Sequence, residues 1–240
     1  MEAGSLPALD GQVVAIAGAS GNLGPTVVAR LSRVGARLAL GGRAQEALDE
    51  LVADLGVEAD TTAVDLLDPA ATRDWADGIA ERLGRVDALV HLVGGWRGGQ
   101  TVEEAPLEDW DVLERQLVRT LQHATQAFAT HLIASGRGRF VGISSGQAQS
   151  PTSKNAVYAA AKAAGEAWTL ALADRFKGTG TTANIVVVGS IVTPAMREES
   201  PDKDFGTFTP AEEIAEAIAY LCSDAAASMN GQRLTLRGAR

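Results

Sequence analysis

Short apolar runs alternate with longer amphipathic stretches along the chain. Most residues in the short runs are β-branched or otherwise apolar, and each run has the length of a strand. Because the apolar residues are not confined to alternate positions, we expect strands that are buried on both faces of a sheet. The expected strands cover residues 13–17, 38–40, 61–64, 88–93, 140–143 and 185–188.

The stretches between these runs have helical periodicity, and each is long enough to connect two parallel strands. The alternation predicts the α/β class: a single-domain Rossmann fold, with helices flanking a doubly wound parallel sheet of about seven strands. A length of 240 residues suits one such domain, so we expect residues 1–240 to fold as a unit. The expected helices lie near residues 23–34, 44–55, 69–83, 107–134, 156–176 and 210–223.

Three irregular segments each follow an expected strand, at residues 94–106, 146–156 and 192–209. In an open parallel sheet, the loops beyond the carboxyl ends of the strands form the ligand crevice. We therefore expect the chemistry of this protein to lie in these three segments.

Composition narrows the class of protein. Hydrophobic residues make up 46% of the chain and charged residues 21%, which is typical of a globular domain. No uninterrupted apolar run approaches the ~18 residues of a membrane span. Residues 1–7 carry an acid and no basic cluster, so we expect no secretory signal and a cytoplasmic location.

Charge and the metal-binding residue types exclude further classes. A net charge of −9 repels phosphate backbones, so we expect a small-molecule ligand and neither nucleic acid nor a membrane as partner. Cys222 is the single cysteine, which excludes an internal disulfide and predicts a role in helix packing. The three histidines lack the spacing of metal ligands, and we expect no metal.

A glycine-rich turn joins the first expected strand to the first expected helix. Glycines there permit a tight turn and bring backbone N–H groups close to a pyrophosphate at the helix N-terminus. The alternative is a strand–helix turn with a purely structural role. The candidate dinucleotide-binding residues of this turn are Gly18, Ser20, Gly21, Asn22, Leu23 and Gly24.

Arg43 follows the second expected strand, about twenty residues after this turn. A carboxylate at that position bonds the ribose of NAD, whereas a guanidinium pairs with the 2′-phosphate of NADP. The sequence therefore favours NADP(H) over NAD(H). The alternative is that Arg43 is a solvated charge at the start of a helix.

Tyr158 and Lys162 stand four residues apart in an Ala-rich stretch, so both side chains should emerge on one helical face. An ammonium beside a phenol favours the phenolate, which predicts a lowered tyrosine pKa and a proton donor for general acid catalysis. Chance spacing is the alternative. The surrounding motifs have to decide between the two.

The chain resembles the short-chain dehydrogenase/reductase family. The resemblance rests on the glycine-rich turn, on the YxxxK element formed by Tyr158 and Lys162, and on Ser145, which lies thirteen residues before the tyrosine. The resemblance covers nearly the whole chain. It implies that all three are catalytic, with Ser145 holding the substrate carbonyl, and that Asp65 touches the adenine and Thr193 the nicotinamide amide. Each also has an ordinary alternative: Ser145 could be a loop hydroxyl, Asp65 a strand-end cap and Thr193 a turn former.

The same resemblance implies further contacts and an assembly. Trp96, Gln147 and Met196 would contact substrate, with a short substrate loop over about 194–209. The long helices near 107–134 and 156–176 would pair in a homodimer or homotetramer, unless the same faces pack internally. The further cofactor contacts would be Leu66, Val93, Gly94, Gly95, Tyr158, Lys162, Gly189 and Ile191.

The chain also departs from the family pattern. Asn22 replaces the middle glycine of the commonest turn, and His91 begins the segment that replaces Asn-Asn-Ala-Gly. Leu117 occupies the position of the catalytic asparagine, which puts the usual proton relay in doubt, and Val188 replaces a proline. Cofactor binding should survive these changes.

The segments around Trp96 and after Thr193 are similar to those of dihydropteridine reductase and related bacterial reductases. Such enzymes reduce flat conjugated rings, on which a tryptophan can stack. Trp96 plugging the crevice is the alternative. The chain differs from dihydropteridine reductase itself in two ways. That enzyme lacks the catalytic serine, whereas this chain has Ser145, and it favours NADH, whereas Arg43 favours NADPH.

These observations favour an NADP(H)-dependent oxidoreductase that reduces a carbonyl, or a conjugated C=O or C=N group, of a small substrate. Two alternatives stay open because fold does not fix function. One is a nucleotide-binding sensor or scaffold, suggested by Leu117. The other is a non-redox lyase or isomerase that uses Ser145 and Tyr158 as acid and base.

Overall fold

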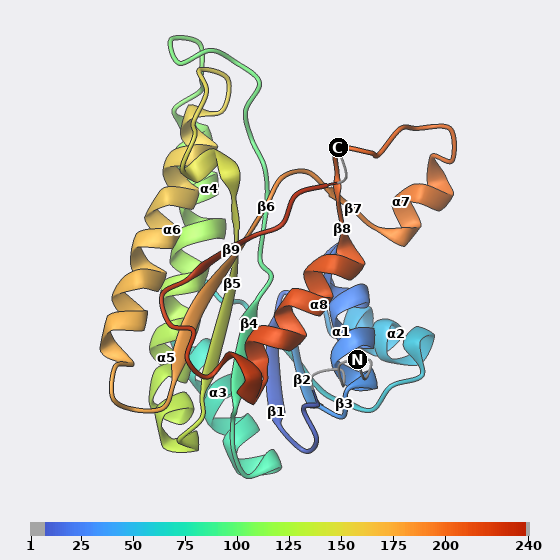
Figure 1. Ribbon diagram of the computed structural model, residues 1–240, viewed down its shortest axis with the longest axis vertical. Coiled ribbons are helices and arrows are strands. Elements are labelled where there is room, and N and C mark those ends of the chain that lie inside the picture. The colour runs from blue at the N-terminus through green and yellow to red at the C-terminus, as the bar shows by residue number, and fades with distance from the viewer. Residues whose placement is uncertain (1–7, 239–240) are drawn as a thin grey trace, which may run out of the picture.

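A parallel sheet of seven strands forms the centre of the computed structural model, which describes residues 8–238 (Figure 1). The expectation about a secretory signal in residues 1–7 lies outside the described residues. The strand order is β3-β2-β1-β4-β5-β6-β9, and the chain reverses direction across the sheet after β3, as in a doubly wound fold. The strands are β1 Val13–Ala17, β2 Arg37–Gly42, β3 Ala59–Ala63, β4 Ala88–His91, β5 Arg139–Ser145, β6 Thr182–Val188 and β9 Arg233–Thr235. The α/β fold class is thus confirmed.

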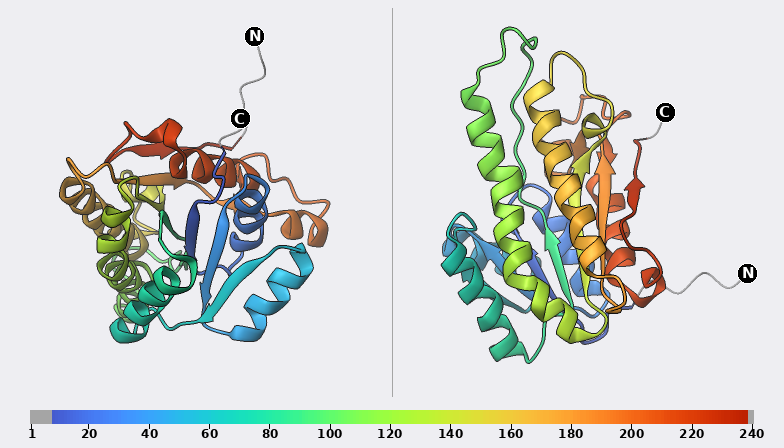
Figure 2. Two further views of the ribbon diagram at one scale, coloured as in Figure 1. Left: turned by 90° about the horizontal axis from the view of Figure 1, so that it is seen from below. Right: turned by 90° about the vertical axis from the view of Figure 1, so that its left-hand side faces the viewer.

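Helices cover both faces of this sheet (Figure 2). Helices α1, α2 and α8 pack on one face, and α3, α5 and α6 pack on the other. The helices are α1 Gly24–Arg33, α2 Gln45–Leu55, α3 Pro69–Leu83, α4 Glu108–Leu113, α5 Thr120–Ser135, α6 Ala156–Arg175, α7 Pro194–Glu199 and α8 Ala211–Cys222. Short 3-10 turns η2 and η3 span Gly146–Ala148 and Asp224–Ala226, and strands β7 Ile191–Val192 and β8 Thr209–Pro210 form a separate pair.

Local sequence explains where several elements begin. The Asp68 carboxylate accepts hydrogen bonds from the backbone N–H groups of Ala70 and Ala71, and Pro69 occupies the first turn of α3. An acidic cap and an early proline are the signals that favour a helix start.

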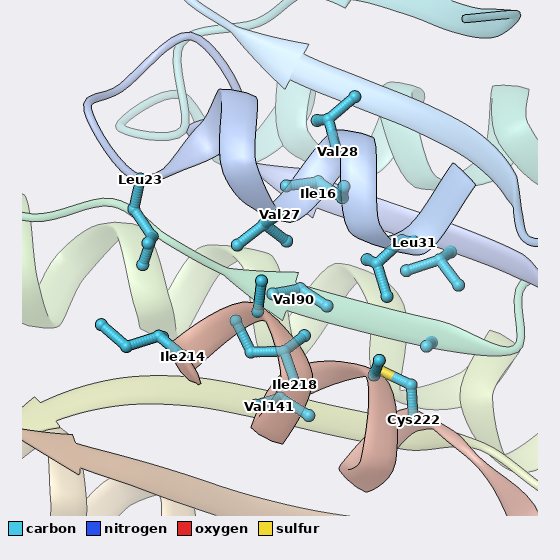
Figure 3. Close-up of a cluster of buried hydrophobic side chains, with 14 of the residues drawn as sticks. Ile16, Leu23, Val27, Val28, Leu31, Val90, Val141, Ile214, Ile218 and Cys222 are labelled. Carbon is cyan, nitrogen blue, oxygen red and sulfur yellow. The ribbon is translucent and has the colours of Figure 1, made fainter. Parts of the chain in front are cut away.

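The apolar core lies where α1 and α8 meet the sheet (Figure 3). Ile16 and Val90 project from β1 and β4 toward Val27 on α1 and Ile218 on α8, and all four are fully buried. Cys222 lies in the same cluster, which confirms its role in helix packing.

The edge of the sheet differs from the expectation. Residues 61–64 were expected to form a strand buried on both faces, but β3 is only partly buried. The reason is its place at the sheet edge, where no further strand covers it. The other edge strand, β9, is short, and the pattern of apolar residues did not predict it.

The helix expected over 107–134 is continuous but contains a turn of π-helix, η1, over Glu114–Arg119 between α4 and α5. Leu117 lies in this turn, and its buried side chain packs against Leu113 and Ala161. Such turns often occur at functional sites. Within residues 8–238 no helix is long and apolar enough to span a membrane.

Candidate active site

The turn between β1 and α1 brings two backbone segments unusually close. Gly18 has φ +81°, and a Cβ there would lie 3.1 Å from the backbone N of Val93. A Cβ at Gly24 would lie 1.7 Å from the carbonyl oxygen of Ala19, which no side chain tolerates. No side chain caps the N-terminus of α1, so this end of the helix can receive an anion.

A first cavity, of about 230 Å³, lies beside this turn at the carboxyl ends of β1, β2 and β3. Its predicted residues include Arg43 and Asp65, which lie on the same cavity wall as the glycine-rich turn. One Asp65 oxygen accepts the N–H of Leu67 at 2.9 Å. The lining residues are Gly18, Ser20, Gly21, Gly42, Arg43, Val64, Asp65, Leu66, Leu67, Leu92, Val93, Gly94, Gln116 and Thr120.

A second cavity of about 390 Å³, the tyrosine cavity, lies on the other side of the turn. It brings the Tyr158–Lys162 pair of α6 together with the segments that follow β1 and β4 and with residues at the carboxyl ends of β5 and β6. Thr193 and Met196 enter it from the segment that β7 and β8 bracket. The lining residues are Gly21, Asn22, Leu23, Leu92, Val93, Gly94, Gly95, Ile143, Ser144, Tyr158, Lys162, Val188, Gly189, Ile191, Thr193 and Met196.

Lys162 is buried, and its ammonium nitrogen lies 5.9 Å from the centre of the Tyr158 ring. The nitrogen donates a hydrogen bond to the carbonyl oxygen of Ile143 at 3.0 Å. Burial lowers the pKa of Lys162 to about 8, against the opposing effect of the Glu166 carboxylate. One helical face thus presents a phenol and a lysine with a near-neutral pKa to a single cavity.

The predicted lowering of the Tyr158 pKa is wrong. Burial raises the pKa of Tyr158, and a hydrogen bond with the Ser145 side chain opposes that rise only in part. The physical reason is that desolvation of the phenolate outweighs the influence of an ammonium that is directed toward Ile143.

A family model described as short chain dehydrogenase matches residues 12–204, which include every strand from β1 to β6. The chain belongs to the short-chain dehydrogenase family. That family consists of oxidoreductases, and the YxxxK element identified in the sequence is among its landmarks. The chain is therefore an oxidoreductase of this family.

Individual members of the short-chain dehydrogenase family match most of the chain. Gluconate 5-dehydrogenase of Gluconobacter oxydans is 31% identical, covering 96% of this chain and 94% of its own. A short chain dehydrogenase from Burkholderia cenocepacia, solved in complex with NADP, is 30% identical with a TM-score of 0.81, covering 96% and 98%. NAD+-bound xylitol dehydrogenase shares the fold, with a TM-score of 0.83 at 22% identity, covering 96% and 99%. Solved structures of this fold thus include both an NADP and an NAD+ complex.

Four predicted site residues of this short-chain dehydrogenase line neither cavity: Gly24, Trp96, Ser145 and Gln147. Gly24 lies behind the turn because of its contact with Ala19. Trp96 is 61% exposed, which contradicts the alternative that it plugs the crevice. The Ser145 hydroxyl accepts a hydrogen bond from the Gln147 N–H at 3.3 Å. Ser145 and Gln147 therefore contact each other just outside the lining of the tyrosine cavity.

The structure also adds residues that the sequence did not indicate. Buried His91 lies 3.2 Å from the Thr120 hydroxyl, which donates its own hydrogen to the Gln116 carbonyl oxygen. His91 Nε2 must therefore be the donor to Thr120. Burial lowers the pKa of His91 to about 3, so its imidazole is neutral. Within residues 8–238 no group of three His, Cys, Asp or Glu side chains is arranged to hold a metal.

Proposed function

We propose that this protein is an NADP(H)-dependent reductase of a carbonyl group, or of a conjugated C=O or C=N group, in a small substrate. The observation that carries the proposal is the tyrosine cavity, which joins Tyr158 and Lys162 to the same glycine-rich turn that borders the first cavity. We name that first cavity the adenosine cavity, because it would hold the adenosine half of the cofactor. The turn is tight because a Cβ at Gly18 would crowd the backbone of Val93 and a Cβ at Gly24 would overlap the carbonyl oxygen of Ala19. We expect one extended dinucleotide to span this turn.

The residues proposed to hold the dinucleotide divide by cavity. Gly21 and the open N-terminus of α1 would receive the pyrophosphate, and Arg43 the 2′-phosphate. Thr193 would bond the nicotinamide amide, and Lys162 a ribose hydroxyl. When bound, the reduced dinucleotide supplies the hydride.

The remaining chemistry belongs to side chains of this protein. Tyr158 and Ser145 bond the substrate oxygen, and Tyr158 donates the proton that this oxygen needs as the C=O bond is reduced. The raised pKa of Tyr158 keeps the phenol protonated before reaction. The Lys162 ammonium stabilises the tyrosinate that is left afterwards.

A screen of NADPH oxidation tests this function directly. Ketones, quinones and pterins are each mixed with NADPH and the purified protein, and the absorbance of NADPH is followed. Oxidation that depends on one of these substrates supports the proposal. Tight NADPH binding with no oxidation in any class would instead favour a nucleotide sensor, and product formation without NADPH consumption would favour a lyase or isomerase.

Arg43 is exposed at the rim of the adenosine cavity and is proposed to select the phosphorylated dinucleotide. Arg43→Ala is expected to weaken NADPH binding about 10-fold to 100-fold and to leave NADH binding nearly unchanged, because a charged hydrogen bond contributes ~1.5–3 kcal/mol. Calorimetric titration with each cofactor measures both constants. Arg37→Ala, at the opposite end of β2, is the control. Equal weakening of both cofactors would contradict the assignment.

Trp96 follows Gly95, which lines the tyrosine cavity, and its indole ring is largely free of protein contacts. The backbone of this segment is anchored, because the Gly99 N–H bonds the Lys154 carbonyl oxygen at 2.7 Å. We expect Trp96→Ala to raise KM for a flat aromatic carbonyl about 5-fold to 10-fold through lost stacking, with little change for a small aliphatic ketone. Steady-state kinetics on both substrates measures this, with Trp110→Ala on α4 as control.

A homo-oligomer remains a proposal. Its support is an outward-facing groove between α5 and α6 whose lining is mostly apolar and includes Trp168, Ala171 and Leu172. Apolar surface of this kind suits contact with a second copy of the chain.

A further inference from the structure

Glu166 carries a buried carboxylate that the proposed reaction does not yet use. It lies on α6 with 4% of its surface exposed. An isolated charge at such a depth is costly, so its partners matter. Three side chains donate to it: the Ser144 hydroxyl at 2.6 Å, the Gln149 amide at 3.2 Å and 3.3 Å to the two oxygens, and the Arg233 guanidinium at 2.6 Å.

These partners come from three different parts of the fold. Ser144 immediately precedes Ser145 at the carboxyl end of β5, Gln149 lies in the loop that follows, and Arg233 begins β9. Glu166 therefore links the helix that carries Tyr158 to the end of the strand that carries Ser145. The two elements that carry the proposed substrate-binding hydroxyls are therefore held together through one carboxylate.

Glu166 is also one helical turn after Lys162, and both residues line a small cavity of about 20 Å³. That volume admits one water molecule. Its polar wall includes His91 and Ser144, and Leu117 fills the side where the family has its asparagine. The cavity next to the lysine therefore has a carboxylate in its wall.

The charged and titratable groups near Lys162 can be followed element by element. From its own helix, Tyr158 and Glu166 face it, and from β4 comes the neutral imidazole of His91. The end of β5 supplies the Ile143 carbonyl oxygen, which is uncharged. Arg233 from β9 pairs with Glu166 and so competes for its charge. Glu166 is thus the carboxylate that favours the ammonium form.

We propose that Glu166 is a positioning residue for carbonyl reduction: it keeps Lys162 in its ammonium form and fixes the end of β5, taking the place of the asparagine that Leu117 has replaced. Arg233 weakens the effect of Glu166 on Lys162, because the guanidinium pairs with the same carboxylate. The inference rests on the proposed function for its catalytic consequence, whereas the Glu166–Lys162 coupling exists with or without turnover.

The coupling can be measured in the folded protein without any substrate. The chain has four lysines, and Lys162 is the buried one, so a ¹³C-lysine NMR titration resolves it from exposed Lys154, Lys177 and Lys203. In the wild-type protein the midpoint should lie at about 8, the pKa that burial imposes on Lys162. Glu166→Gln is expected to move it down by about one unit, because a neutral amide no longer favours the ammonium.

A purely structural role for Glu166 predicts the opposite shift. If Glu166→Gln only loosened the packing, water would reach Lys162 and its midpoint would rise toward the ordinary lysine value. An upward shift, or none, therefore overturns the proposal. Glu216→Gln is a matched control, because it removes another carboxylate–arginine pair, with Arg30, far from Lys162. Glu166→Asp keeps the charge and should restore much of the wild-type midpoint.

Arg233→Met gives a second, independent test of the proposal if Glu166→Gln does not fold. Removing the competing cation should raise the Lys162 midpoint, and an unchanged midpoint in this variant counts against the proposal. In kinetics, the loss of reductase activity at high pH should begin about one unit lower in Glu166→Gln than in wild type. If no carbonyl is turned over by wild type, the proposed function fails, while the NMR shift still decides the Glu166–Lys162 coupling.

Discussion

Tyr158→Phe is expected to lower kcat for carbonyl reduction by at least about 100-fold while leaving the NADPH dissociation constant within about 2-fold of wild type. The phenol is the proposed proton donor, and a positioned general acid contributes about 10²-fold to 10⁴-fold. Phe keeps the ring that packs beside Leu113 and Leu117, so the fold should not change. Single-turnover kinetics and a binding titration on the same sample separate the two quantities.

The chain offers a matched control for this change. Tyr220, on α8, is its only other tyrosine, and 38% of its surface is exposed. Tyr220→Phe should retain wild-type turnover. If Tyr158→Phe also retained wild-type turnover, Tyr158 would not be the proton donor and the proposed mechanism would be wrong.

Lys162→Met is expected to lower turnover as severely as Tyr158→Phe and also to weaken NADPH binding, because Lys162 is proposed to bond a ribose hydroxyl. The same change should stabilise the protein at pH 7 by about 1–3 kcal/mol. Burial lowers the Lys162 pKa from its ordinary 10.5 to about 8, so the folded state holds the charge at a cost. Loss of the bond to Ile143 offsets part of the gain.

The stability difference between Lys162→Met and wild type should depend on pH. Between about pH 8 and 10.5 the unfolded chain binds the Lys162 proton more than the folded chain does, so the stability of wild type rises with pH across that window. Lys162→Met lacks this rise, and its advantage should shrink as the pH increases. Urea unfolding at pH 7 and pH 10 measures both differences, with exposed Lys154→Met as control. A variant less stable than wild type at pH 7 would contradict the argument.

Much of the fold could be read from the sequence because burial and periodicity are local signals. The runs at residues 13–17 and 185–188 are apolar throughout, and both are central, fully buried strands. Strand β9 gave no such signal, because it is three residues long with a charged residue at its start. Its pairing with β6 is made by long-range contacts. The π-turn at Leu117 was equally hidden, since apolar positions continue through it.

The site was predictable only as far as spacing determines contact. The four-residue step from Tyr158 to Lys162 did place both in one cavity. It did not reveal that burial of the phenol raises the Tyr158 pKa while the ammonium is directed to Ile143, so the predicted direction of the pKa shift was wrong. Glu166 repeats the same four-residue step after Lys162, so its face could have been inferred. Its partners Ser144 and Arg233 could not, because they depend on the register of the sheet.

The pairing of β9 with β6 also bears on how the protein is made. Arg233 reaches Glu166 only after β9 has added to the sheet, so this ion pair forms after β1 to β6 have been translated. A nascent chain that has emerged from the ribosome only as far as α8 lacks both Leu234, which packs against the apolar core, and the cation that pairs with Glu166. The sheet and the charge pairing of Glu166 should therefore be completed together, when β9 docks.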